Sequence, residues 1–244
     1  MLSVTFKKSN FPYSYTEEIK QLRTNIEFSG SDKKVIVITS TYANEGKSTL
    51  SLELAKSFAE LGKNVLLIDA DMRSSELAEK RVSNAATQTQ LKGLSHLLSG
   101  QTTLEQVLVK TDIPHFYTIF SGRVPPNPSE LLSNSKMSNL LEWSREQFDI
   151  VLIDTPPIKI VADASVVAPL SDGAIMVIKA NKVSRKDAQT ALKQFDRVNC
   201  PILGIVLNQV KQSSSEYKKR GYGYYGKYGK YAKSNNASKP SPKS

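Results

Sequence analysis

The sequence predicts one α/β domain built around a doubly wound, mostly parallel sheet. Apolar runs rich in Val, Ile and Leu recur without polar alternation, as expected for parallel strands that are buried on both faces. Segments with helical spacing of apolar residues separate these runs, and strands that alternate with helices are typical of this fold class. Several runs end in Asp, Asn or a Gly-Lys-Ser-Thr turn, which is where such sheets bind ligands.

The elements follow from local patterns taken in chain order. A first helix is expected over residues 15–28, where Ile19, Leu22 and Ile26 recur at helical intervals and Thr16 can cap the first turn. Apolar runs predict strands at 35–39, 64–68, 116–120, 149–153, 172–180 and 201–207. Helical patterns predict further helices at 50–61, 93–98, 103–109, 129–133, 136–147, 162–170 and 184–198. The polar stretch 74–92 predicts a loop, and the prolines within 122–128 exclude both helix and central strand.

The turn after the first strand has the order of a phosphate-binding P-loop: strand, loop, Gly-Lys-Ser/Thr, helix. We expect Lys47 to reach the outer phosphates and the Ser48 hydroxyl to ligate Mg²⁺. The residues expected to bind nucleotide are Asn44, Glu45, Gly46, Lys47, Ser48, Thr49 and, further along the chain, Asn208. Thr41 stands where the P-loop template has its first Gly, so an ordinary strand-to-helix turn is the alternative interpretation.

Three acidic side chains follow two of the predicted strands. Asp154 follows Ile-Val-Leu-Ile, the pattern of a Walker B strand, and can hold Mg²⁺ directly or through water. Asp69 and Asp71 lie two residues apart and therefore face the same side of an extended segment. One of the pair can hold Mg²⁺ while the other accepts a proton from an attacking hydroxyl. The alternative for this pair is a salt bridge with Arg73.

Charge and composition set the expected boundaries. The chain has 244 residues and a net charge of +10, but residues 211–244 carry nine Lys and Arg against Glu216 alone. The preceding 210 residues are nearly neutral, so we expect no nucleic-acid partner. We predict a flexible, loosely held arm at 1–14, a globular domain at 15–210 and a disordered, basic, Tyr-rich tail at 211–244. No apolar run of ~18 residues or signal peptide is found, and there is one cysteine, features that point to the cytoplasm.

Three further stretches carry a family pattern. Residues 66–73 read Leu-Leu-Ile-Asp-Ala-Asp-Met-Arg, residues 125–132 read Pro-Pro-Asn-Pro-Ser-Glu-Leu-Leu, and residues 154–157 read Asp-Thr-Pro-Pro. Together with the tyrosine cluster of the tail, they resemble the bacterial protein-tyrosine kinases (BY-kinases) of capsule and exopolysaccharide loci. The resemblance covers residues from about 15 to 231. The chain is similar to the form of this family that lacks a membrane-spanning segment.

The resemblance implies an enzyme that uses ATP and Mg²⁺ to phosphorylate tyrosines on a neighbouring copy and thereby regulates polysaccharide synthesis. It implies catalytic roles for Lys47, Asp69, Asp71 and Asp154, with Ser48, Asp71 and Asp154 as the metal ligands. It implies that Asn208 contacts adenine. The implied phosphoacceptors are the tail tyrosines Tyr217, Tyr222, Tyr224, Tyr225, Tyr228 and Tyr231.

The resemblance also implies partners. A separate membrane adaptor of the polysaccharide co-polymerase type would activate the kinase and hold it at the inner face of the cell membrane. A cognate tyrosine phosphatase would reverse the reaction. The family's oligomerisation motif, Glu-x-x-Arg-x-x-Arg, corresponds to Glu17, Lys20 and Arg23, so a ring-like homo-oligomer is implied. Lys20 replaces an Arg and loses the bidentate fork, and an ordinary solvated helix face is the alternative.

The sequence is also compatible with two other classes of function. A Min- or Par-type ATPase switch shares the fold, but that group carries a Lys where this chain has Tyr42. A non-catalytic scaffold is the second class, because a tail of Tyr, Gly and Lys can bind RNA by stacking and charge. In the loop itself, Ala43-Asn44 replaces the Pro-Gly that the BY-kinases often have. Asn tolerates a left-handed turn better than other non-Gly residues, so we expect the loop geometry to survive.

Overall fold

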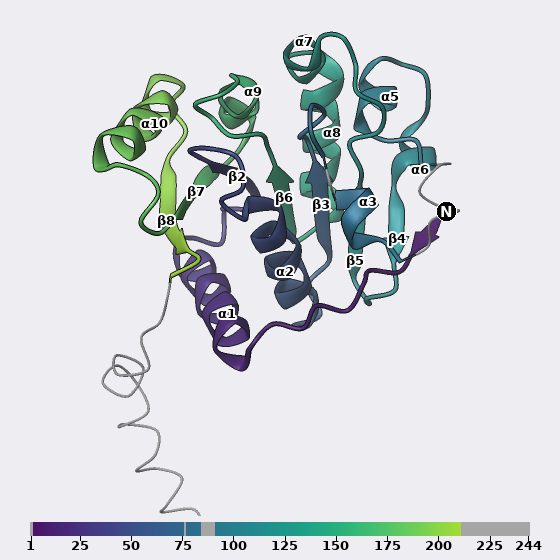
Figure 1. Ribbon diagram of the computed structural model, residues 1–244. Coiled ribbons are helices and arrows are strands. Elements are labelled where there is room, and N and C mark those ends of the chain that lie inside the picture. Colours follow the sequence, from purple (N-terminus) through teal and green to yellow (C-terminus); the bar gives the residue numbers. More distant parts are fainter. Residues whose placement is uncertain (1, 76, 84–90, 211–244) are drawn as a thin grey trace, which may run out of the picture. The chain divides into compact units, whose positions relative to one another are not determined.

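The computed structural model describes residues 2–75, 77–83 and 91–210 (Figure 1). The described residues up to Gln209 form one compact unit with an eight-stranded sheet in the order β1-β4-β5-β3-β6-β2-β7-β8. The strands are β1 (Ser3–Val4), β2 (Val35–Ser40), β3 (Val65–Asp69), β4 (Val109–Thr111), β5 (Phe116–Ile119), β6 (Ile150–Asp154), β7 (Gly173–Lys179) and β8 (Ile202–Asn208). All neighbours pair in parallel except β4 and β5, which are antiparallel. The predicted doubly wound, mostly parallel fold is confirmed.

Helices cover both faces of this sheet (Figure 1). One face packs on α1 (Tyr13–Phe28), α2 (Lys47–Ala59) and α3 (Leu77–Arg81). The other face packs on α5 (Leu94–Leu98), α6 (Leu104–Val107), α7 (Pro128–Leu132), α8 (Ser135–Gln147), α9 (Asp163–Val167), the 3₁₀ helix η1 (Ala168–Leu170) and α10 (Arg185–Arg197). β2, β3 and β6 are buried along their whole length, which explains their unbroken apolar sequences.

The N-terminal segment differs from the loosely held arm expected at residues 1–14. Ser3–Val4 pairs in parallel with β4, and Phe6 forms an antiparallel bridge with Val82. Val4 and Phe6 are buried, and the Phe6 ring stacks on Phe116 at 5.6 Å. Two apolar side chains are too few to produce a periodic pattern, but here they are enough to attach the segment to the sheet.

The segment 74–92 also differs from expectation, because residues 77–81 form the short helix α3 rather than loop. Leu77 and Val82 are buried against the α2 face of the sheet and supply the packing that the polar composition conceals. The expected tail, residues 211–244, lies outside the described residues, as do its six tyrosines. In the described ranges, no helix combines the length and the apolar content needed to span a membrane.

Candidate active site

The P-loop connects the end of β2 to the beginning of α2 and contains two residues in the left-handed region. Gly46, with φ of +88°, ends the loop, and Asn44 has φ of +63°. The expectation that Asn44 tolerates a left-handed turn is therefore confirmed. Thr41 is fully buried and is absent from the positive-φ residues of the described chain. The loop thus forms without glycine at that position, because the backbone there does not need a left-handed conformation.

Glu45 anchors the loop from the inside. Its carboxylate accepts hydrogen bonds from the backbone N–H groups of Thr41 at 2.7 Å and Tyr42 at 3.0 Å. It also accepts one from the N–H of Lys179, at 3.4 Å, on β7. Glu45 is only 2% exposed. That Glu45 binds nucleotide stays a prediction; in the structure its carboxylate accepts hydrogen bonds from the protein's own backbone.

Replacing Glu45 with Ala is expected to weaken ATP binding about tenfold or more. The change leaves two loop N–H groups without their acceptor, and an unsatisfied buried donor costs about 1–3 kcal/mol. Without this anchor the loop is expected to become disordered and must be ordered again when phosphate binds. Part of this cost is therefore expected to raise the dissociation constant for ATP. Isothermal titration with ATP measures the effect. Glu60→Ala, on the exposed end of α2, is the matched control, and equal affinities for the two variants would contradict the anchoring role.

Four of the predicted charged residues meet at the carboxyl ends of β3 and β6. Asp69 and Asp154 are direct partners in the parallel register of these strands. Lys47 Nζ lies 3.0 Å from Asp71 Oδ2 and 3.7 Å from Asp154 Oδ2. It also lies 3.2 Å from the Ser48 hydroxyl oxygen. All four charged groups are buried, so the ordinary strand-to-helix turn does not account for this cluster. The structure brings together Lys47, Ser48, Asp69, Asp71 and Asp154 as the sequence predicts.

Burial and mutual repulsion shift the protonation of these groups. Burial and the neighbouring Asp154 raise the pKa of Asp69 to about 7. Burial also raises the pKa of Asp154, while the nearby Lys47 opposes that shift. Burial would lower the pKa of Lys47, but Asp154 and Asp71 together hold it above its ordinary value. Lys47 therefore stays protonated, and Asp69 is a carboxyl group that can exchange a proton near neutral pH.

The turn after β3 is held by hydrogen bonds to these carboxylates. Asp69 accepts from the hydroxyl of Ser75 and from the backbone N–H of Asp71, the latter at 3.3 Å. Asp71 accepts in turn from the N–H of Ser74 at 3.1 Å. The turn is thus folded around the two side chains that would do the chemistry. Ser75 was not singled out from the sequence, where it is one serine in a polar stretch.

Arg73 does not pair with Asp69 or Asp71, so the salt-bridge alternative for that pair is wrong. Its Nε donates to the fully buried Asp163 at 2.9 Å, and its Nη2 donates to the Ser129 hydroxyl at 3.0 Å. The Ser129 hydroxyl also donates to Asp163. This cluster joins the end of the 66–73 motif, the 125–132 motif and α9. Asp163 is a residue that sequence reasoning missed, because it lies 90 positions from Arg73.

Asn208 lies beside the P-loop at the end of β8. Its side-chain Nδ2 donates to the backbone carbonyl of Glu45 at 2.9 Å, and Gln209 Nε2 lies 3.4 Å from the carbonyl of Asn44. A Cβ on Gly46 would stand 2.3 Å from Asn208 Nδ2, so a larger residue there would displace the Asn208 side chain in addition to straining the positive φ. Asn208 therefore contacts the P-loop, and its contact with adenine remains a prediction.

The donor set fits Mg²⁺ provided that the nucleotide supplies further ligands. Carboxylate and hydroxyl oxygens are hard donors, and Mg²⁺ is usually bound by one or two carboxylates together with phosphate and water. Among the described residues no group of three or more His, Cys, Asp or Glu side chains is arranged to hold a metal ion by itself. Ser48, Asp71 and Asp154 lie around Lys47 and would form the protein's share of such a site.

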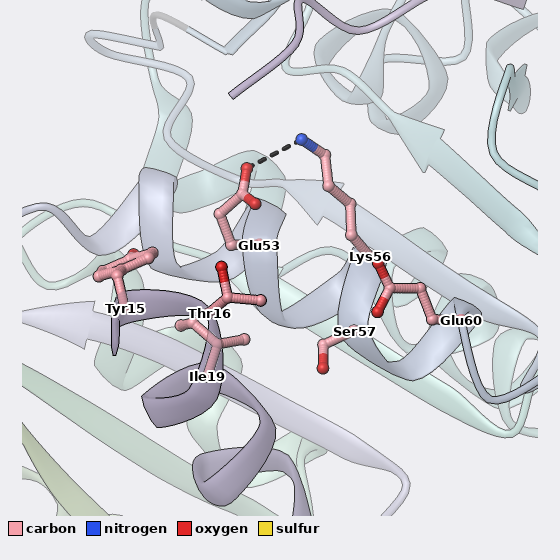
Figure 2. Close-up of a pocket in the computed structure, with 7 residues that line it drawn as sticks. All are labelled: Tyr15, Thr16, Ile19, Glu53, Lys56, Ser57 and Glu60. Atoms are coloured by element: carbon pink, nitrogen blue, oxygen red, sulfur yellow. Dashed lines mark hydrogen bonds and ion pairs between the residues drawn. The ribbon is translucent and has the colours of Figure 1, made fainter. Parts of the chain in front are cut away.

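The predicted oligomerisation residues lie on α1. Glu17 and Lys20 form an ion pair of 2.8 Å on the exposed side of the helix, with side chains 44% and 42% exposed. Arg23 points the other way, because its Nη1 donates to the carbonyl of Ser57 at 2.7 Å and to its hydroxyl at 3.0 Å. Figure 2 shows the pocket between α1 and α2, lined by Tyr15, Thr16, Ile19, Glu53, Lys56, Ser57 and Glu60. Of the three, Glu17 and Lys20 are therefore the ones whose side chains lie at the surface, and their contact with a second copy remains a prediction.

The sheet order, the loop that ends in Gly-Lys-Ser and the acidic strand ends are together typical of the P-loop class of nucleotide-binding proteins. A family profile described as "AAA domain" matches residues 33–202. The tyrosine-protein kinase CpsD of Streptococcus agalactiae is 41% identical over 210 residues, which cover 85% of this chain and 90% of that protein. The kinase domain of the Escherichia coli tyrosine kinase ETK superposes with a TM-score of 0.74 and 29% identity, covering 85% of each chain.

The chain belongs to the bacterial tyrosine-protein kinase family, and the enzyme class predicted from the sequence is confirmed. The septum site-determining protein MinD of Pyrococcus horikoshii, solved with Mg-ADP, has a TM-score of 0.61 over 74% of this chain and 72% of its own. At 22% identity that likeness shows the fold alone. MinD thus shares the fold of this chain.

Proposed function

We propose that this chain transfers the γ-phosphoryl group of Mg·ATP to tyrosines in the tail of a second copy. The observation that carries the proposal is the buried cluster in which Lys47 contacts Asp71 and Asp154 while the pKa of the adjacent Asp69 is about 7. A cation, two carboxylates and a carboxyl group that titrates near neutrality are the parts that phosphoryl transfer to a hydroxyl requires.

Each residue has a defined task in this proposal. Lys47 stabilises the negative charge of the outer phosphates, and the loop N–H groups and the N-terminus of α2 bind the phosphates behind them. Ser48, Asp71 and Asp154 would hold Mg²⁺, which supplies charge neutralisation on the transferred group. Asp69 takes the phenol proton, a step that matters because a free tyrosine has a pKa of about 10. The phenol oxygen then bonds to phosphorus as ADP leaves.

The acceptors in this proposal are Tyr217, Tyr222, Tyr224, Tyr225, Tyr228 and Tyr231, in a sequence where Gly and Lys alternate with Tyr. We further propose that copies meet through the exposed Glu17 and Lys20, with Arg23 supporting α1 from behind. By its family membership we propose a membrane adaptor as activator, a cognate tyrosine phosphatase, and a role in controlling exopolysaccharide or capsule synthesis at the inner membrane face. Asn208 would contact adenine.

A mixing experiment tests transfer between copies. The donor is the chain truncated after residue 210, and the acceptor is the full chain carrying Lys47→Met, which is expected to lack activity of its own. After incubation with Mg·ATP, mass spectrometry is expected to find phosphotyrosine in the acceptor's tail, because the donor has an active site and no tail. An acceptor in which all six tail tyrosines are Phe is the control. ATP hydrolysis without phosphotyrosine would instead favour a Min-type switch.

A further inference from the structure

Arg81, the last residue of α3, lies beside the beginning of α2. Its Nη2 donates to the hydroxyl of Thr49 at 2.5 Å. Thr49 is in the first turn of α2, and the N–H of Leu50 is bonded to the carbonyl of Gly46 at 3.0 Å. The N–H groups of the three residues before Leu50 have no carbonyl partner within α2, because the first turn of a helix leaves them free. They are the part of the P-loop that binds an anion.

A guanidinium group at this place lies at the unfavourable end of α2, and Glu53, on the next turn of the same helix, is an acid that shares its surroundings. The N-terminus of a helix carries about half a positive charge, so that cations are stabilising at the opposite end. Lys47 already places one ammonium group in the same turn. A bound phosphate reverses the balance, because arginine pairs with phosphate through two N–H groups and its planar fork is preorganised for this geometry. A ligand with negative charge would therefore stabilise Arg81 in this position beyond what Thr49 and Glu53 provide.

The N-terminal segment fixes the backbone of Arg81 in this position. The carbonyl of Arg81 accepts a hydrogen bond from the N–H of Lys7 at 2.7 Å, and the N–H of Ser83 donates to the carbonyl of Thr5 at 2.8 Å. Between these two bonds Phe6 pairs with Val82 and is buried. Figure 1 shows the segment running from β1, at the edge of the sheet beside β4, past α3 to the start of α1. The backbone of residues 81–83 is thus paired with that of residues 5–7.

We propose that Arg81 is a nucleotide-binding residue whose guanidinium contacts the phosphates nearest the start of α2, which ADP and ATP share. Residues 5–7 position it by pairing with residues 81–83. The proposal rests on the nucleotide site described under the proposed function. It adds to that site a residue, Arg81, that lies outside the P-loop, the acidic strand ends and the 125–132 motif. It also gives the N-terminal segment a part in substrate binding.

The test compares ADP affinity with the stability of the unliganded protein. In the full chain, Arg81→Met keeps the aliphatic stem and removes the charge, and the dissociation constants for ADP and ATP are both expected to rise about tenfold. The melting temperature without nucleotide is expected to stay the same or to increase, because the repulsion from the start of α2 is removed. Arg81→Lys, which keeps the charge but loses the fork, is expected to recover part of the affinity.

The controls separate this proposal from the one on which it rests. Arg197→Met, at the exposed end of α10, is expected to bind ADP like the wild type. If the wild type itself does not bind ADP, the nucleotide site is wrong. If the wild type binds ADP and Arg81→Met binds it equally well at a temperature below both melting points, the role of Arg81 is wrong and the nucleotide site stands. A loss confined to ATP would also overturn the proposal, because it would place Arg81 at the γ-phosphate.

Discussion

Replacing Lys47 with Met is expected to reduce tail phosphorylation at least ~10³-fold. Lys47 is the cation that lies between Asp71 and Asp154, at 3.0 and 3.7 Å. Without it, two buried carboxylates face the incoming phosphates with no protein cation in this cluster, so both nucleotide binding and the stabilisation of the transition state are lost. Mass spectrometry of the tail after timed incubation with Mg·ATP gives the rate.

The matched control for this change is Lys63→Met, which alters an exposed lysine in the turn after α2. Its phosphorylation rate is expected to equal that of the wild type. Tail phosphorylation that persists in pure Lys47→Met protein would rule out this cluster as the site of chemistry. A lower melting temperature is also expected for Lys47→Met, because removing one partner of a buried ion pair is strongly destabilising.

Asp69→Asn is expected to separate activity from stability. The change removes the group proposed to accept the phenol proton, and loss of a general base typically costs 10²- to 10⁴-fold in rate. The same change is expected to raise the melting temperature of the nucleotide-free protein at pH 8. Asn keeps an oxygen that accepts from Ser75 and from the N–H of Asp71, and it has no charge to bury.

The sign of this stability effect follows from the direction of the pKa shift. The pKa of Asp69 is raised from 3.8 to about 7, so folding favours its neutral form. Below pH 4 the group is neutral in the folded and unfolded chains and costs nothing. As pH rises from 4 to 7 only the unfolded chain ionises freely, and stability falls until the full penalty is present above pH 7.

Melting curves in EDTA at pH 4.5 and pH 8 measure this effect. The difference between Asp69→Asn and the wild type is expected to be small at pH 4.5 and clear at pH 8, at roughly 2–4 °C for each kcal/mol. Asp149→Asn, in the exposed turn before β6, is the control and is expected to show no such gain. A lower melting temperature for Asp69→Asn than for the wild type at pH 8 would contradict this prediction, because it would mean that ionised Asp69 stabilises the fold.

The parts of the site that the sequence predicts are those encoded locally. The strand ends at Asp69 and Asp154, the Gly-Lys-Ser turn and the left-handed Asn44 each follow from a few neighbouring residues. In a parallel sheet such ends meet at one edge, so local patterns were enough to place these groups together.

The parts that the sequence does not predict depend on contacts between distant positions. The pairing of Arg73 with Asp163 links residues 90 positions apart, and no local pattern distinguishes it from a pairing with Asp71. The Glu45 carboxylate is oriented by the N–H groups of Thr41 and Tyr42. These groups point at it only when the loop is folded. The attachment of residues 3–6 to β4 and Val82 likewise depends on the finished sheet.

The fastening of the P-loop by β8 has a consequence for synthesis on the ribosome. Asn208 donates to the carbonyl of Glu45 across 163 positions, and Gln209 reaches Asn44 across 165. A nascent chain emerges from its N-terminus at about 5–20 residues per second. The loop therefore leaves the exit tunnel roughly 8–30 s before the strand that fastens it. Until then the P-loop lacks these two hydrogen bonds, so β8 completes the loop only after the loop itself has left the tunnel.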